Sequence, residues 1–346
     1  MVDKRAVRRR RGLWGRGLWA CVALVFGALA SCTSTSAAGP PASTTPGAAS
    51  VSPTGAVTPS SVPSTTSSTV AAPPTTTGPP QFFWGYGDPL ICGTPTAIET
   101  AGAIEAERRS GPLSLPASVR SQRVLLVGDS TACSLWPGVN AIGNAVGVAT
   151  YQGAVFGCGI ASGQITTTRN ESITPHSSRC PAFVGWALPN AMTRARPTVV
   201  IWMSIWEKSD LVVAGHTIVA NTPRWESEIM ARMDGALALL TAGGARVVLV
   251  TEAAPAPNPA QRSETTDAQA DDAGYVRLNA LLQRFRARHP DQVRLVDLAA
   301  KLCPGGPPCP AVVSGSQPRP DGRHFTPAAA TSVARWLFSQ IFATPG

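Results

Sequence analysis

Four short, continuous apolar runs stand out in the later two-thirds of the chain: 123–128, 197–204, 245–251 and 293–297. They are rich in β-branched residues and are hardly interrupted by polar positions. This pattern is typical of strands that are buried on both faces of a parallel sheet. A weaker run over 147–152 predicts a fifth strand.

Longer stretches with helical spacing of apolar residues separate and follow these runs: 134–146, 181–195, 223–242, 272–289 and 326–342. Alternation of strand and helix predicts an α/β fold with a doubly wound sheet of about five parallel strands. In such sheets ligands bind beyond the carboxyl ends of the strands. We interpret residues 81–121 as an irregular lead-in that packs on the domain spanning 81–346.

The first 31 residues predict an export signal. A basic start is followed by an apolar run of thirteen residues, 18–30, which is too short for a bilayer-spanning helix of about 20 residues. The run ends in Leu-Ala-Ser-Cys, which resembles a bacterial lipoprotein signal in which Cys32 is lipidated and becomes the new N-terminus. The alternatives are an ordinary secretory signal with a chance cysteine and an uncleaved anchor helix.

A low-complexity tether follows the signal over 32–80. From Thr33 onward it has no charged and no aromatic residue and consists almost entirely of Thr, Ser, Pro, Ala, Gly and Val. Such a composition offers too little apolar surface to fold, and its prolines favour an extended chain. It is either an O-glycosylated stalk or a bare linker.

The net charge of +9 first points to a nucleic-acid partner. Residues 1–31, however, hold seven basic side chains and one acidic one, so only +3 remains on the other residues. Because no basic stripe with interleaved aromatic residues remains there, we expect no nucleic-acid binding.

Cysteine usage agrees with export. Six cysteines remain after the signal and position 32: Cys92, Cys133, Cys158, Cys180, Cys303 and Cys309. An even number in an exported domain predicts three disulfides, with fifteen connectivities possible. Cys303 and Cys309 flank a Pro-Gly-Gly-Pro-Pro segment, which favours a local bridge. A Cys158–Cys180 bridge would close a second loop and leave Cys92 for Cys133.

Candidate chemistry lies near the two ends of the domain. The first strand runs into Gly-Asp-Ser, which places Ser130 at the sheet's carboxyl edge before a helix. Asp321 stands three residues before His324, just ahead of the final helix. A carboxylate at this spacing can orient the imidazole and stabilise its charged form while His324 takes the proton of Ser130.

With these two blocks, residues 120–345 resemble the SGNH (GDSL-type) hydrolase superfamily. They are closest to the extracytoplasmic SGNH domains associated with acyltransferase-3 membrane proteins. The resemblance implies a three-layer α/β/α, flavodoxin-like fold. It also implies that Ser130 is the nucleophile, His324 the general base and Asp321 its orienting partner.

The resemblance further implies an oxyanion hole. Its donors would be the backbone N–H of Ser130 and that of Gly157 or Gly159. The family's third block carries Gly-x-Asn-Asp, whose Asn side chain is a third donor, but no Asn stands at this place here. The indole N–H of Trp206 can fill the place, or Trp206 simply packs with Trp202.

Other polar residues near the motifs have structural interpretations. We expect Asp129 to shape the nucleophile turn, and Glu207 and Asp210 to lie in an exposed charged loop. The remaining histidines are expected on the surface: His176, His216 and His289. No Gly-rich phosphate loop, C-x₂-C pair or His cluster is present, so we expect neither a cofactor nor a metal.

These observations favour a membrane-tethered, extracytoplasmic serine esterase that acts on small acyl esters. Its location and the resemblance suggest O-acetyl groups on envelope carbohydrate or glycolipid. The same site would be an acyltransferase if a sugar hydroxyl replaced water. The alternative is a catalytically weak carbohydrate-binding or scaffold lipoprotein, with Trp202, Trp206 and Trp225 lining a sugar surface. We expect a monomer.

Overall fold

A computed structural model of the protein describes residues 81–82, 92, 95–161, 165–166, 180–257 and 271–342. All of them belong to one unit of the chain, Val70–Gly346. The expected signal peptide, the expected lipidation site Cys32 and the tether over 32–80 lie outside the described residues, as does His176. The predictions made for them therefore stay predictions.

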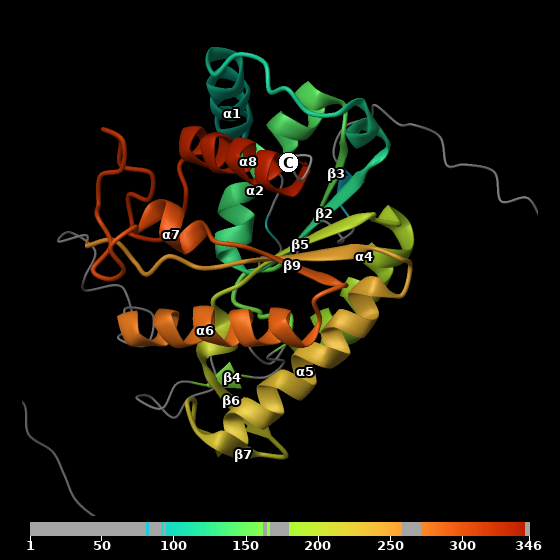
Figure 1. Ribbon diagram of the computed structural model, residues 1–346, viewed down its shortest axis with the longest axis vertical. Coiled ribbons are helices and arrows are strands. Elements are labelled where there is room, and N and C mark those ends of the chain that lie inside the picture. Colours follow the sequence, from blue (N-terminus) through green and yellow to red (C-terminus); the bar gives the residue numbers. More distant parts are fainter. Residues whose placement is uncertain are drawn as a thin grey trace, which may run out of the picture. The chain divides into compact units, whose positions relative to one another are not determined.

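Six strands form one parallel sheet in the order β1-β3-β2-β5-β8-β9 (Figure 1). Five of them confirm the predicted strands: β2 (Arg123–Gly128), β3 (Ala149–Ala154), β5 (Val199–Met203), β8 (Arg246–Val250) and β9 (Val293–Val296). The sixth, β1 (Gln81–Phe82), is a two-residue addition at one edge. The chain winds outward from β2 in both directions, so the doubly wound fold is confirmed.

Burial on both faces explains the continuous apolar runs. Val124, Leu125, Leu126 and Val127 of β2 are all fully buried. Side chains alternate between the faces of a strand, and Leu125 and Val127 join one core cluster while Val124 and Leu126 join the other. Neither face of the central strand can therefore carry polar residues.

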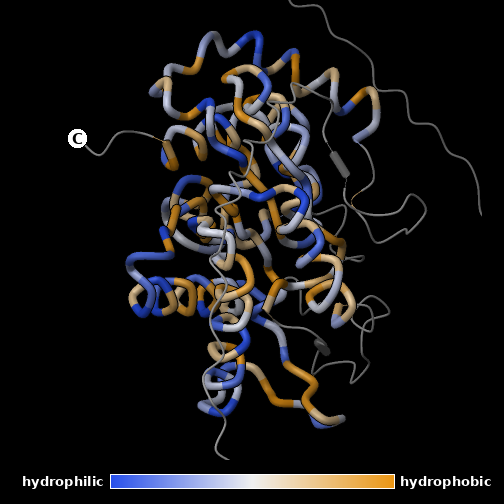
Figure 2. Tube along the Cα trace, turned by 90° about the vertical axis from the view of Figure 1, so that its right-hand side faces the viewer, coloured by the Kyte–Doolittle hydropathy of each residue, from blue (hydrophilic) through white to orange (hydrophobic). Residues whose placement is uncertain are grey.

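Helices cover both faces of the sheet (Figure 1). One core cluster draws on α4 (Leu188–Ala195), α5 (Pro223–Thr241) and α6 (Asp272–Arg288). The other draws on α2 (Ser130–Val146) and α8 (Pro327–Phe342). Hydrophobic and hydrophilic residues alternate within single helices in Figure 2, as expected where one side of a helix is buried.

The lead-in is not irregular as predicted. It contains α1 (Ala97–Arg109), which packs on α2 and α8. Thr96 caps this helix by accepting a hydrogen bond from the N–H of Glu99, whose carboxylate accepts one from the N–H of Thr96 in return. This reciprocal capping box is a helix start that the sequence carries and that we overlooked.

Shorter elements complete the fold. A second, antiparallel sheet that was not predicted has the order β4-β6-β7: β4 (Ile165–Thr166), β6 (Asp210–Val213) and β7 (His216–Ile218). The short helical segments are α3 (Cys180–Ala182), a π-helical turn (Phe183–Ala187), α7 (Leu298–Leu302) and two 3₁₀ turns (Ala117–Ser121 and Trp206–Lys208).

Three disulfides link these elements: Cys92–Cys133, Cys158–Cys180 and Cys303–Cys309. These are the three pairings that the sequence suggested among the fifteen. The first ties the lead-in to the first turn of α2, and the second ties the loop after β3 to α3.

Candidate active site

Ser130 is the first residue of α2 and stands directly beyond the carboxyl end of β2. Asp129 caps the helix, because its carboxylate accepts a hydrogen bond of 2.8 Å from the N–H of Thr131. Helix N-termini carry free backbone N–H groups and a partial positive charge. The serine therefore lies where a developing negative charge is favoured.

The glycine of Gly-Asp-Ser is required by a close approach of two strands. Gly128 has a φ of +148°, and a Cβ atom there would lie 1.7 Å from the carbonyl oxygen of Met203 at the end of β5. Any other residue would push the nucleophile turn away from β5. This explains why the block begins with Gly in this chain.

Asp129 ties the nucleophile turn to the segment after β5. Its Oδ2 accepts hydrogen bonds from the N–H of Ile205 (2.7 Å) and the hydroxyl of Ser204 (3.2 Å). The side chain is fully buried, and this burial raises its pKa against the lowering effect of these hydrogen bonds. These contacts fit the expected role in shaping the turn.

The loop before α8 presents the histidine. Oδ1 of Asp321 accepts hydrogen bonds from the N–H groups of Arg323 (2.8 Å) and His324 (2.7 Å). Its Oδ2 lies 2.5 Å from Nδ1 of His324. Burial acts to raise the pKa of Asp321, but the hydrogen bonds from His324 and the two N–H groups outweigh burial and hold it below the ordinary value. The carboxylate thus stays ionised.

Arg319 and Gly322 hold this loop against the segment that follows β8. Arg319, which is only 3% exposed, donates from Nη1 to the carbonyl oxygens of Ala253 (3.1 Å) and Ala254 (3.0 Å). Gly322 accepts a hydrogen bond of 2.9 Å from the N–H of Ala256, and at its φ of +83° a Cβ atom would lie 2.4 Å from the carbonyl oxygen of that residue. The histidine loop is therefore fixed to the segment after β8.

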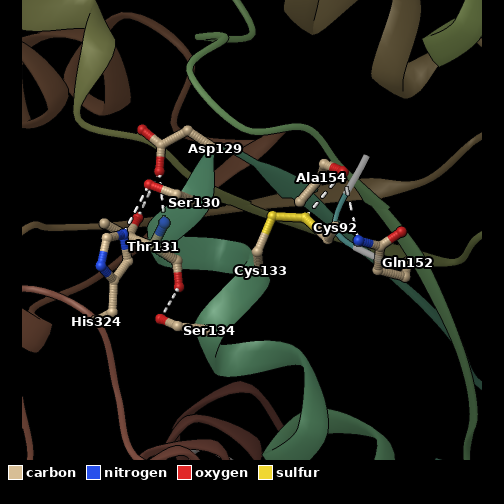
Figure 3. Close-up of a disulfide and its surroundings, with 9 residues drawn as sticks. All are labelled: Cys92, Asp129, Ser130, Thr131, Cys133, Ser134, Gln152, Ala154 and His324. Carbon is tan, nitrogen blue, oxygen red and sulfur yellow. Dashed lines mark hydrogen bonds between the residues drawn. A yellow bond between two sulfur atoms is a disulfide. The ribbon is translucent and has the colours of Figure 1, made fainter. Parts of the chain in front are cut away.

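These two segments bring the three predicted residues together. Nε2 of His324 lies 2.9 Å from Oγ of Ser130, and Nδ1 faces Asp321 (Figure 3 shows the serine and the histidine). The residues form a chain of carboxylate, imidazole and hydroxyl. Such a chain can remove the serine proton as the oxygen attacks a carbonyl carbon.

A pocket of about 330 Å³ opens beside this chain of residues. Its walls are mostly apolar, and its lining includes both Ser130 and His324. The other lining residues are Cys92, Pro95, Glu99, Cys133, Ser134, Pro137, Phe156, Phe325 and Pro327. The Cys92–Cys133 disulfide, next to Ser130 in Figure 3, is thus part of the wall.

The expected oxyanion residues lie on the neighbouring loops. Gly157 and Gly159 are buried in the loop after β3, whose last residue Ala154 pairs with Gly128. Trp206 follows β5, and its Nε1 is buried without a hydrogen-bond partner among the described residues. None of the three lines the pocket, although Phe156 of the same loop does.

Several residues are more buried than the sequence suggested. The prediction that Glu207 and Asp210 lie in an exposed charged loop is wrong, because their side chains are only 1% and 4% exposed. Trp202 and Trp225 are also buried, at 2% and 3% exposed, so they do not line a sugar-binding surface. The Glu207 carboxylate accepts a hydrogen bond from the N–H of Ile160, and the Asp210 carboxylate accepts one from the N–H of Ala220. These partners are distant in sequence, so the sequence alone does not reveal them.

His289 is not simply solvated. Its Nε2, at the C-terminal end of α6, lies 2.8 Å from Oδ1 of Asp234 within α5. His216 is exposed as expected.

Beneath the nucleophile turn lies a cluster of buried charged side chains that sequence reasoning missed. Its carboxyl groups are Asp129, Glu207 and Glu252, and its basic groups are Lys208, Arg319 and Arg323. Burial raises the pKa of both glutamates and lowers the pKa of Lys208 to about 8. Within the described residues there is neither a group of His, Cys, Asp and Glu side chains suited to a metal nor a helix able to cross a membrane.

The sequence matches the family model described as "SGNH domain (fused to AT3 domains)" over residues 99–337. The protein belongs to this SGNH family. It is accordingly an SGNH-type esterase or acylhydrolase. No curated protein matches the sequence.

Several solved structures are similar to this SGNH protein at low identity. One is a putative acylhydrolase from Bacteroides fragilis, with 14% identity, a TM-score of 0.37 and coverage of 68% of this chain and 93% of the other. Another is Est24, a carbohydrate acetylesterase from Sinorhizobium meliloti, with 13% identity, a TM-score of 0.39 and coverage of 64% and 98%. A third is the acetyl xylan esterase AlAXEase, with 15% identity, a TM-score of 0.36 and coverage of 63% of this chain and 98% of the other.

Proposed function

We propose that the protein is an extracytoplasmic serine esterase that uses Ser130, His324 and Asp321. The observation that supports this most directly is the 2.9 Å approach of His324 Nε2 to Ser130 Oγ, with Asp321 on Nδ1. The lowered pKa of Asp321 keeps its carboxylate ionised, so it stabilises the imidazolium that forms.

The reaction proceeds in two steps. Ser130 Oγ attacks the ester carbonyl carbon as His324 takes the hydroxyl proton, and the carbonyl electron pair moves to oxygen. When the tetrahedral intermediate collapses, the bond to the alcohol breaks and His324 returns the proton to the leaving oxygen. Water activated by the same imidazole then attacks the acyl-enzyme and releases the acid. A sugar hydroxyl in place of this water makes the step an acyl transfer.

The developing oxyanion is stabilised by the N–H of Ser130 at the start of α2, by Gly157 or Gly159, and by the indole N–H of Trp206. The buried Nε1 of Trp206 has no hydrogen-bond partner in the part of the chain that the structure describes. This supports its inclusion, because an enclosed donor without an acceptor is unfavourable in the resting protein.

The proposed substrate is a small acyl ester, such as an O-acetyl group, on cell-envelope carbohydrate or glycolipid. The export signal predicted over 1–31 and the predicted lipidation of Cys32 support a place on the outer face of a membrane. A family description that names fusion to AT3 domains agrees with an extracytoplasmic domain.

The test is hydrolysis of p-nitrophenyl acetate and labelling by a fluorophosphonate, with the full chain and its Ser130→Ala variant. Both signals are expected in the wild type and neither in the variant. Labelling of equal strength in both proteins would remove the proposal. Released acetate from envelope extracts, present with wild type and absent with Ser130→Ala, would identify the natural ester.

A further inference from the structure

The residues of the proposed site lie on three loops that follow the adjacent strands β3, β2 and β5. The loop after β3 carries Gly157 and Gly159, the turn after β2 carries Ser130, and the segment after β5 carries Trp206. Catalysis by this arrangement requires the three loops to stay in register, because an oxyanion donor must stay within hydrogen-bond distance of one oxygen atom.

Two buried carboxylates cross-link these loops. Asp129 joins the nucleophile turn to the segment after β5 through the N–H of Ile205. Glu207, from that same segment, reaches the loop after β3: its Oε1 accepts hydrogen bonds from the N–H groups of Ile160 (2.7 Å) and Ala161 (3.1 Å).

The geometry points to Glu207 as the positioning residue of the oxyanion loop, residues 155–161. Its carboxylate holds the far end of this loop through two consecutive N–H groups. The near end is held by a hydrogen bond of 2.8 Å from the N–H of Val155 to the carbonyl oxygen of Gly128. This inference rests on the proposed function, because it concerns the donors of the same reaction.

The surroundings of Glu207 favour this role over a merely solvated charge. The side chain is 1% exposed, and desolvation of a carboxylate is unfavourable unless hydrogen bonds compensate it. The two hydrogen bonds that Oε1 accepts both come from backbone N–H groups of this one loop. The Cys158–Cys180 disulfide links the middle of this loop to α3.

Glu207→Gln and Glu207→Leu separate the acceptor from the bulk of the side chain. Gln keeps an oxygen for both N–H groups, whereas Leu has a similar size and leaves them unpaired. Asp234→Leu is the control, since the Asp234 carboxylate also joins two segments: it links α5 to the C-terminal end of α6 through Arg288 (3.0 Å) and His289 (2.8 Å).

With p-nitrophenyl acetate, Glu207→Leu is expected to lower kcat about 100-fold at unchanged KM, because an oxyanion contact acts mainly in the transition state. Glu207→Gln is expected to stay within about fivefold of the wild type, since a neutral acceptor is weaker than a charged one but present. Asp234→Leu is expected to keep the wild-type kcat.

Hydrogen–deuterium exchange of the Ile160 and Ala161 amides supplies a readout that does not depend on turnover. Exchange there is expected to rise at least about tenfold in Glu207→Leu, and not in Glu207→Gln or Asp234→Leu. If Glu207→Leu does not fold, Glu207→Asp tests the same positioning role. It keeps the carboxylate but is one methylene too short to reach both N–H groups, so kcat is expected to fall at least about tenfold.

Two outcomes overturn the inference. One is a folded Glu207→Leu, or Glu207→Asp in its place, whose kcat stays within about threefold of wild type. The other is unchanged exchange at Ile160 and Ala161. Failure of the proposed function looks different, because Ser130→Ala would then retain the wild-type activity whatever residue stands at 207.

Discussion

The carboxyl groups of Asp129 and Glu252 face each other across a single hydroxyl. Oγ1 of Thr131 lies 2.8 Å from Oδ1 of Asp129 and 3.1 Å from Oε1 of Glu252. A hydroxyl has one hydrogen to donate and can accept another. Both contacts are therefore satisfied when one carboxyl carries a proton, and burial, together with the charge of Asp129, raises the pKa of Glu252 well above its ordinary value.

Glu252→Gln is expected to change the pH dependence of stability. A raised pKa means that the folded protein holds a proton that the unfolded chain releases above the ordinary value of 4.5. The free energy of unfolding of the wild type therefore falls as the pH rises through this window. Gln mimics the protonated form, so the free energy of unfolding of the variant should rise relative to that of the wild type between about pH 5 and pH 8. Urea unfolding at both pH values measures the gain.

The control for Glu252→Gln is Glu226→Gln, at a half-exposed glutamate that pairs with Arg284. The free energy of unfolding of this variant is expected to change with pH in the same way as that of the wild type. If the free energy of unfolding of Glu252→Gln also changes with pH as that of the wild type does, the carboxyl at 252 is ionised in the folded protein and the shared-proton arrangement is wrong.

Asp321→Asn is expected to lower kcat by about 10³- to 10⁴-fold, as loss of the orienting carboxylate does in Ser-His-Asp hydrolases. The lowered pKa of Asp321 also adds stability that is present above the ordinary value of 3.8 and is lost as the pH falls through the lowered value. The difference in free energy of unfolding between wild type and variant should therefore reach its largest value near pH 6 and be smaller near pH 3. A difference that is constant over this range would contradict the assignment.

Trp206→Phe removes the indole N–H and keeps an aromatic ring between the two core clusters that Trp206 contacts. If Nε1 is an oxyanion donor, kcat for p-nitrophenyl acetate should fall about 10²-fold while KM stays the same. Trp225→Phe serves as the comparison, because that indole donates to the carbonyl oxygen of Ser209 (2.8 Å). Equal kcat values for Trp206→Phe and the wild type would leave Trp206 with a packing role only.

Removal of the Cys92–Cys133 disulfide, as Cys92→Ser/Cys133→Ser, is expected to cost about 3 kcal/mol of stability. It should also raise KM, because this disulfide lines the pocket and holds the lead-in against α2. The Cys303–Cys309 bridge joins residues only 6 apart rather than 41, so its removal should cost about 1–2 kcal/mol less and leave KM unchanged. Identical KM values for both double variants would exclude a role of the first bridge in the pocket.

Sequence patterns predicted the central sheet because its strands are buried on both faces and are therefore apolar throughout. They missed α1 because its large apolar residues, Ile98 and Ile104, are 84% and 53% exposed, so no buried stripe marks the helix. The antiparallel sheet was missed because its strands have only two to four residues.

At the candidate site, local motifs were enough to select Ser130, Asp321 and His324. The buried carboxyls Glu207 and Glu252 could not be found in this way. A charged residue is most often exposed, and what buries these two is a set of partners from other loops, such as Ile160 and Thr131. Such partners become neighbours only when β2, β3, β5 and β8 align.

The most direct test of the central claim is to trap the covalent intermediate. The full chain is mixed with p-nitrophenyl acetate, quenched in acid within the first turnover and digested for mass spectrometry. The account predicts one acetyl group on Ser130, absent from Ser130→Ala and strongly reduced in His324→Ala. Acetylation at another residue, or equal acetylation in the wild type and both variants, would contradict it.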